Sequence, residues 1–361
     1  MEKPRRRRPP HAGERLTRAD VIRLKRQHGT PDGLDLRRAD LRQTDLSRLD
    51  LGGARLSRAN LRGAALRHTN LEHARLQNAD LQAADLRRAS LQGANLLDAN
   101  LQGSHLRDAN LQGASLWGAN LQGADLCDAN LRGAHLVSAK LQGADLRFAN
   151  LQGAVPRYAN LQGANLLGAN LQEADLGGAD LRRARLAEAD LRHTDLEGAN
   201  WGDYVLGDEM AGDFRGAASA HRALKQRHTE TGMYDIAGEF HYREMEARRK
   251  VAWGEFRLPY ALAMYALRFL YGYGERPERV IGWAAAVIFG LALVHWLFGT
   301  VAGGFLDALY YSAVSFPALG YGTWAPEPQG WAGRFLGVGE SLIGVFMMAL
   351  FLVTFTRKMT R

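Results

Sequence analysis

Residues 91–110 read LQGANLLDANLQGSHLRDAN, and their pattern decides how the first half of the chain folds. A leucine recurs at every fifth position from Leu36 to Leu196, with Pro156 as the exception, and Trp201 takes the next place. The residue two positions before each leucine is usually alanine, and the residue directly before it is usually Asn or Asp. Self-similarity at a fixed period indicates a repeat architecture.

Neither regular secondary structure can bury this set of leucines. An α-helix turns by about 100° per residue, so steps of five would spread the leucines around the cylinder. A plain strand alternates its side chains and would send successive leucines to opposite faces. A coil that turns one corner every five residues points every leucine to a common axis. The repeat therefore predicts a solenoid with a leucine core.

The pattern resembles the pentapeptide-repeat family, whose members form a right-handed, four-sided β-helix. The resemblance implies that residues 31–205 form such a solenoid, with four repeats per coil. Pro156 cannot donate a ladder hydrogen bond, so we expect a local flaw in one coil. Some family members imitate DNA with a strongly acidic surface. Residues 31–200 carry twenty basic and twenty acidic residues, which disfavours that function. We expect a scaffold or assembly surface, or a ligand-responsive regulatory role, with a cytoplasmic partner that the sequence does not name.

Residues 1–30 are predicted to form a basic tail and a capping helix. They contain ten Lys or Arg against three acids, a surplus that fits a solvated tail or anionic lipid headgroups better than nucleic acid. Thr17 and Asp20 have the spacing of a helix N-terminus, and this helix would cover the open end of the solenoid. No apolar stretch follows the arginine-rich start, so no secretory signal is expected. The single cysteine, Cys127, fits a reducing compartment.

Two helical segments are expected after the solenoid. Residues 206–255 have helical spacing with a break near Gly232, which predicts a cytoplasmic helical hairpin that caps the solenoid or transmits force to the membrane. Residues 256–275 are apolar and aromatic but contain Arg257, Pro259 and Arg268. An interfacial helix is therefore predicted, and a third membrane span is the alternative.

Two uncharged or nearly uncharged stretches within residues 276–361 predict membrane spans, Ile281–Gly299 and Phe335–Phe355. Basic residues flank the outer ends of the pair of spans, and Arg334 is the only basic residue in the loop between the spans. The positive-inside rule then places both termini in the cytoplasm, which gives a multi-pass protein of the cell's inner (plasma) membrane. His295 is interpreted as part of an aromatic belt at the interface, in preference to a proton sensor. Glu340 lies inside the second span and requires a partner, and we expect a hydrogen bond to the helix between the spans or a role in ion entry.

Residues 305–322, FLDALYYSAVSFPALGYG, lie between the two spans. A half-spanning helix followed by an extended segment that ends in Gly-Tyr-Gly resembles the pore helix and selectivity filter of tetrameric two-span potassium channels. The resemblance implies that backbone carbonyls from four copies replace the hydration shell of K⁺. The implied filter consists of Ala318, Leu319, Gly320, Tyr321 and Gly322. Tyr310, Tyr311 and Thr323 would support the filter, Gly344 would be a hinge, and Glu340 a pore-tuning acid.

Three residues depart from the usual filter pattern. Ala318 stands where the family has threonine, Pro317 precedes it, and Thr323 replaces the usual aspartate. The prediction is therefore a homotetrameric potassium-type channel with no cofactor other than permeant K⁺. A weakly selective cation channel and a membrane-anchored scaffold without conduction are the alternatives. No nucleophile–base pair, metal spacing or phosphate loop stands out, so an enzyme is not expected.

Overall fold

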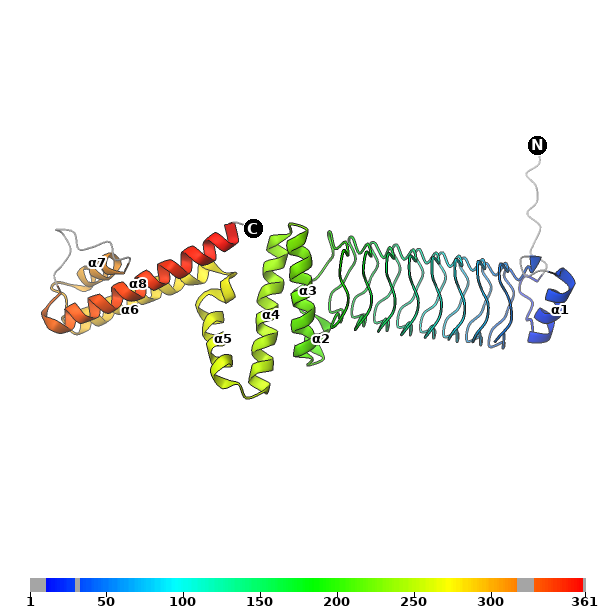
Figure 1. Ribbon diagram of the computed structural model, residues 1–361, viewed down its shortest axis with the longest axis horizontal. Helices are drawn as coiled ribbons and strands as arrows, with labels where there is room; N and C mark the ends of the chain where they lie inside the picture. The colour runs from blue at the N-terminus through cyan, green and yellow to red at the C-terminus, as the bar shows by residue number, and fades with distance from the viewer. Residues whose placement is uncertain (1–10, 30–32, 317–327, 360–361) are drawn as a thin grey trace, which may run out of the picture. The chain divides into compact units, whose positions relative to one another are not determined.

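The computed structural model describes residues 11–29, 33–316 and 328–359, and the chain divides into two compact units, Met1–Ala247 and Arg248–Arg361. The first unit contains the leucine repeat, with helices at its two ends (Figure 1). The second unit is helical. Each unit is described by itself below.

The repeat folds into a solenoid in which each coil takes 20 residues. Isolated parallel β-bridges join residues 20 apart in the chain, such as Asn100 to Asn120 and His105 to Asp125. Within the described residues the solenoid contains single-residue bridges and no longer strand. Each bridge has two backbone hydrogen bonds; at Asn120, for example, the N–H of Leu101 donates to its carbonyl oxygen at 2.7 Å and its own N–H donates to the Ala99 carbonyl at 2.9 Å. With five residues per repeat, one coil holds four repeats.

The corners of each coil explain the five-residue period. The second residue after each leucine has a positive φ, as at Gly103 (62°) and Asp108 (58°), and the third returns its N–H to the leucine carbonyl. A turn with positive φ at its third residue favours Gly, Asn or Asp there, which the repeat often supplies. The leucines and the preceding alanines then line the axis and are almost completely buried. Each buried leucine contributes about 2 kcal/mol before the cost of ordering the chain.

Pro156 produces the expected flaw in one coil. From Asp35 to Asp180, every fifth residue forms a bridge with the residue 20 further on, except that the described bridges lack the pair Val155–Asp175. The N–H of Asp175 still donates to the Ala154 carbonyl at 2.9 Å, so only the bond that Pro156 would donate is lost. Because Pro156 stays buried in the leucine position, the core continues through the flaw.

Helix α1 (Arg18–His28) covers the N-terminal end of the solenoid, as Figure 1 shows. Its predicted capping box is present: the Thr17 hydroxyl accepts from the N–H of Asp20, and the Asp20 carboxylate accepts from the N–H of Thr17. Leu16, Val21 and Leu24 are buried in the same core cluster as the solenoid leucines. The helix therefore shields the first coil from water.

Helices α2 (Gly207–Met210), α3 (Phe214–Glu230) and α4 (Tyr234–Gly254) follow the last coil, and the predicted break at Gly232 separates α3 from α4. Leu224 of α3 and Phe240 of α4 are fully buried in the solenoid core cluster. The Phe240 ring contacts the Trp201 ring edge-on, with 5.0 Å between the ring centroids. This hairpin closes the C-terminal end of the core, which agrees with the capping alternative.

Buried Asp208 completes the cap by replacing the next coil. Its Oδ2 accepts the backbone N–H groups of Leu186 and Ala187 at 2.8 and 3.1 Å, and its Oδ1 accepts from Arg185 Nε at 3.2 Å. In earlier coils the corresponding leucine N–H donates to a carbonyl of the following coil. The carboxylate thus satisfies donors that the end of the solenoid would leave buried and unpaired.

The second unit contains α5 (Leu258–Tyr271), the short 3₁₀ helix η2 (Gly272–Gly274), α6 (Pro277–Leu297), α7 (Phe305–Ser315) and α8 (Gly330–Met359). Among the described residues, two helices are long and apolar enough to cross a membrane, α6 and residues Gly330–Thr356 of α8. Helix α6 includes all but the last two residues of the first predicted span, and α8 includes the whole of the second. With 14 residues, α5 is shorter than the roughly 20 residues that a transmembrane helix needs, which disfavours a third span.

Candidate pore site

Helix α7 packs against both α6 and α8, which run side by side in Figure 1. The helix predicted between the spans is therefore present, with its end within one residue of the expected Phe316. At its start, the Asp307 carboxylate accepts the N–H of Gly304 at 2.7 Å. A carboxylate in the first turn also suits the positive end of the helix dipole.

The C-terminal end of α7 is attached to α8 by two close contacts. The Ser341 hydroxyl donates to the Ser315 carbonyl at 2.9 Å. At Gly344 the α8 backbone comes so near the Phe316 carbonyl oxygen that an added Cβ would collide with it. Only glycine allows this approach, since any side chain would collide with backbone. The Phe316 ring is itself buried beside Val280 and Met347. The position from which the chain leaves α7 is thereby determined.

A buried polar cluster joins α6 to α8. His295 and Glu340 are shielded from solvent, with His295 Nε2 3.5 Å from Glu340 Oε2. The other ring nitrogen, His295 Nδ1, lies 2.7 Å from the Thr300 hydroxyl. The His295 ring also meets Tyr311 of α7 edge-on, with 5.0 Å between the centroids. Ionisable groups inside apolar segments are costly unless they are paired, so this cluster links the three helices specifically.

The ends of the segment between the spans are also joined. Val301 and Pro328 form an antiparallel bridge, and the N–H of Gln329 donates to the Thr300 carbonyl at 2.7 Å. A Cβ at Gly333 would lie 2.7 Å from the same carbonyl oxygen, so α8 begins in close contact with the end of α6. Val301 and Pro328, at the two ends of this segment, are therefore held side by side.

The aromatic-belt interpretation of His295 is wrong. Its side chain is fully buried between the helices of its own unit, whereas a belt residue would face the lipid headgroups. Trp296 and Trp331, in contrast, are exposed at 47% and 83%. Glu340 Oε2 lies 3.5 Å from His295 Nε2 of α6, but neither carboxylate oxygen of Glu340 has a hydrogen-bond partner among the described residues, so the expected hydrogen bond to α7 is not found there.

The predicted site residues fall into three groups. Tyr311 is fully buried, while Tyr310 is 47% exposed, so the two tyrosines have different surroundings. Gly344 makes the close contact described above, and its role as a hinge stays a prediction. Ala318, Leu319, Gly320, Tyr321, Gly322 and Thr323 lie outside the described residues, as does Pro317.

Sequence reasoning missed the serines of the site. The hydroxyls of Ser312 and Ser315 are buried on α7 with no hydrogen-bond partner among the described residues. The Ser341 bond to α7 was also not anticipated. A polar residue in an apolar helix was the available signal, but the partner depends on how the helices cross. No group of His, Cys, Asp or Glu within the described ranges could hold a metal ion.

A repeat solenoid is thus joined to a unit that contains two helices long and apolar enough to cross a membrane and a short helix between them. Family models agree with both parts: "Pentapeptide repeats" matches residues 35–72, 69–108, 109–147, 139–178 and 164–200, and "Ion channel" matches residues 279–361. Comparison with curated proteins gives no significant match.

Pentapeptide repeat proteins are among the solved structures that resemble the chain. HetL, a protein involved in heterocyst differentiation regulation from the cyanobacterium Nostoc sp. strain PCC 7120, is 32% identical over 51% of this chain and 94% of its own, with a TM-score of 0.20. A second protein from Nostoc PCC 7120 is 41% identical over 28% of this chain and 84% of its own, with a TM-score of 0.25. Rfr23 from the cyanobacterium Cyanothece 51142 is 40% identical over 27% and 63%, with a TM-score of 0.17. The chain belongs to the pentapeptide-repeat family and carries an ion channel domain at residues 279–361.

Proposed function

We propose that the protein is a homotetrameric potassium-type channel, in which the carbonyl oxygens of Ala318–Gly322 from four copies surround a dehydrated K⁺ ion. Tyr311, Tyr310 and Thr323 support this filter, and no cofactor takes part. The observation that carries the proposal is the packing of α7 against both apolar helices, with its C-terminal end bonded to α8 a few residues before the Gly-Tyr-Gly sequence. A short helix fixed in this way determines where the next residues enter the membrane.

Four copies are required because one filter strand cannot surround an ion. The apolar surface of a single unit supports association. Phe335, Leu342 and Val353 of α8 are exposed at 74%, 68% and 65%. Side chains of this kind need lipid or neighbouring subunits around them. In a tetramer, one face of α8 would line the pore and the others would meet these partners.

The orientation follows from the distribution of charge. Arg276 and Arg279 precede α6 or begin it, and Arg357, Lys358 and Arg361 follow the apolar stretch of α8, so both termini lie on the cytoplasmic side of the cell's inner membrane. The solenoid is then a cytoplasmic, right-handed quadrilateral β-helix. Its 20-residue coil and parallel bridges support the four-sided form. It serves in assembly or gating, through contacts with an unidentified partner.

Ion flux through liposomes that contain the purified protein tests conduction and selectivity together. With K⁺ or Na⁺ as the permeant ion, we expect a larger flux of K⁺. Equal flux of both ions would identify a weakly selective cation channel, and no flux of either would favour a scaffold. Oligomer mass in detergent separates these cases further, since a monomer contradicts the shared pore.

The departure at Ala318 provides a sharper test. Ala318→Thr restores a ring of four hydroxyls at the innermost site, so the reversal potential under mixed K⁺ and Na⁺ is expected to move toward the K⁺ equilibrium potential. Ala313→Thr, an equal change on the exposed part of α7, is the matched control and leaves the reversal potential unchanged. An unchanged potential in Ala318→Thr would reject this account of the filter.

A further inference from the structure

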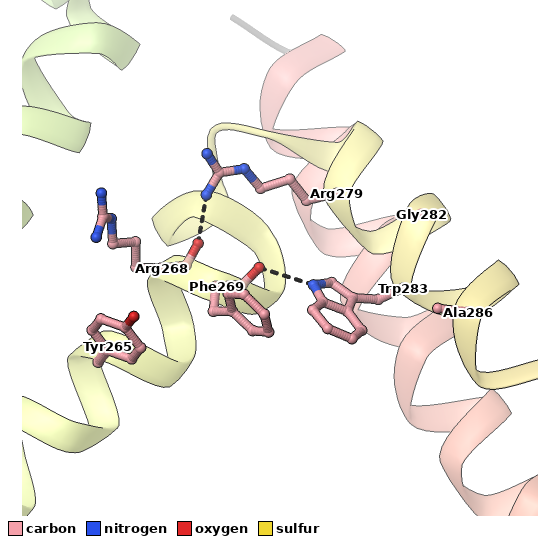
Figure 2. Close-up of a pocket in the computed structure, with 7 residues that line it drawn as sticks. All are labelled: Tyr265, Arg268, Phe269, Arg279, Gly282, Trp283 and Ala286. Atoms are coloured by element: carbon pink, nitrogen blue, oxygen red, sulfur yellow. Dashed lines mark hydrogen bonds between the residues drawn. The ribbon is translucent and has the colours of Figure 1, made fainter. Parts of the chain in front are cut away.

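A pocket of about 550 Å³ lies between α5 and α6 (Figure 2). Its lining combines two charged residues, both arginines, with aromatic rings and two small residues of α6. The complete lining is Tyr265, Arg268, Phe269, Arg279, Gly282, Trp283 and Ala286. The pocket belongs wholly to the second unit and is separate from α7. A site of this size with a basic part and an apolar part fits an amphipathic ligand.

Two hydrogen bonds hold the walls of the pocket together, both drawn in Figure 2. Arg279 Nη1 donates to the Arg268 carbonyl at 2.8 Å, and Trp283 Nε1 donates to the Phe269 carbonyl at 3.1 Å. The rings of Phe269 and Trp283 are in contact, with 4.5 Å between their centroids. A guanidinium has five N–H donors, so this bond leaves further donors of Arg279 able to bind an anion.

The apolar part of the pocket follows α6 away from Arg279. Gly282 and Ala286 are one turn apart on α6, and their small size leaves the groove open beside Trp283. Phe269 and Tyr265 on α5 are exposed at 54% and 52%. In water such exposure of large rings is unfavourable, whereas hydrocarbon chains beside a membrane helix would cover them.

We propose that this pocket binds an anionic phospholipid, with its headgroup phosphate at Arg279 and Arg268 and one acyl chain along Phe269, Trp283 and Ala286. The pocket lies near the start of α6, a helix long and apolar enough to cross a membrane. A lipid bound there can place its phosphate at the arginines and an acyl chain along the apolar part of the pocket. Arginine forms bidentate, charge-assisted bonds with phosphate. Basic residues at the cytoplasmic end of a span also attract anionic lipids. This site goes beyond the proposed channel function, and its test does not use conduction.

Phosphate could also come from a soluble ion, and the experiment separates the two sources. The full chain in neutral detergent receives dioctanoyl-phosphatidylglycerol, dioctanoyl-phosphatidylcholine or inorganic phosphate, and native mass spectrometry measures the molecules retained per subunit. We expect phosphatidylglycerol to be retained and phosphatidylcholine to be retained roughly tenfold less, because both lipids carry the phosphate but the positive quaternary ammonium of choline is repelled by the arginines. If inorganic phosphate displaces phosphatidylglycerol at equal concentration, the lipid assignment is overturned.

Two pairs of variants test the two parts of the pocket. Arg279→Gln removes the charge and is expected to reduce phosphatidylglycerol retention about tenfold, whereas Arg334→Gln removes an exposed arginine at the start of α8 and serves as its control. Gly282→Leu fills the groove, and its control Gly290→Leu adds the same side chain two turns further along α6. At both glycines a Cβ would meet no other described heavy atom within 4 Å, so the fold accepts either change.

Retention by Gly290→Leu together with loss in Gly282→Leu supports the site even if Arg279→Gln fails to fold. Wild-type retention in both Gly282→Leu and Arg279→Gln would overturn the proposal. Equal retention of phosphatidylglycerol and phosphatidylcholine by the wild type would also contradict it, because the arginines would then have no effect on headgroup choice.

Discussion

The solenoid and the second unit are stabilised in different ways. Because the proposed pore belongs to the second unit (Arg248–Arg361), this unit is called the pore unit below. In the solenoid one small set of interactions recurs in every coil: a buried leucine, a corner with positive φ and paired backbone bonds between coils. In the pore unit each important contact occurs once, as between Gly344 and Phe316 or between His295 and Glu340. A defect in the solenoid is therefore absorbed locally, as at Pro156, whereas a defect in the pore unit has no neighbour that can compensate.

The largest expected effect is in the pore unit. Gly344→Ala places a methyl group against the Phe316 carbonyl oxygen, so α7 and α8 must separate. We expect complete loss of ion flux in liposomes and loss of the detergent-stable oligomer. Gly339→Ala on the same helix, where a Cβ meets open space among the described residues, is expected to behave as the wild type. Normal flux through Gly344→Ala would contradict the rigid attachment of α7.

The cap of the solenoid tests whether the regular region also depends on single contacts at its end. Asp208→Ala leaves the buried N–H groups of Leu186 and Ala187 without their acceptor. We expect the free energy of unfolding of the repeat region to fall by about 3 kcal/mol, measured by urea denaturation. Asp203→Ala removes an exposed turn bond to Val205 and is expected to cost less than 1 kcal/mol. Equal effects of the two changes would contradict the special role of Asp208.

The same cap is expected to weaken in mild acid because of His228. Burial, with a contribution from Arg227, lowers the pKa of His228 from 6.5 to about 4. The His228 ring stacks on the Phe240 ring, with 5.4 Å between the ring centroids, and neither nitrogen of His228 has a hydrogen-bond partner among the described residues. Between pH 6.5 and 4 the unfolded chain binds the proton and the folded chain does not, so the free energy of unfolding falls as the pH falls, by about 3 kcal/mol in total.

His228→Phe is expected to remove most of this dependence in urea unfolding curves between pH 7 and 4.5. Glu244 defines the lower limit of that window. Burial alone would raise the pKa of Glu244, but hydrogen bonds from Lys225 and Arg222, with His241 nearby, outweigh burial and hold the pKa well below its ordinary value. The stability that Glu244 contributes is then lost only as the pH falls below about 4.5. An unchanged pH dependence in His228→Phe would assign the effect to other groups.

The smallest expected effect is the repair of the solenoid flaw. Pro156→Leu restores the donor to the Asp175 carbonyl and the missing bridge at Val155. A gain of about 1 kcal/mol from the hydrogen bond is partly offset by the greater freedom of the unfolded chain without proline. We therefore expect less than 1 kcal/mol of stabilisation in urea. A loss of several kcal/mol would indicate that the coil has adapted its packing to proline.

Much of the fold could be predicted because its signals are local or periodic. The leucine period predicted the solenoid, Pro156 predicted a local flaw in one coil, and Thr17 with Asp20 predicted the N-terminal cap. The two apolar helices and the short helix between them were also predicted from length and hydropathy. The filter at Ala318–Gly322 stays a prediction, because those residues lie outside the described part of the chain.

The sequence by itself determined the repeat, since a leucine at every fifth residue allows one way to bury the set. The family resemblance implied four repeats per coil, and the bridges between residues 20 apart show this coil length. Only the tertiary structure decided which single residues meet. It placed His295 beside Glu340, the Asp208 carboxylate at the N–H of Leu186 in the last coil, and Arg279 in the lining of the α5–α6 pocket. The residues that meet in these contacts are not neighbours in the sequence and do not follow a repeat. Their contacts depend on where helices cross and end, which is decided by packing across the whole unit and not by any local pattern.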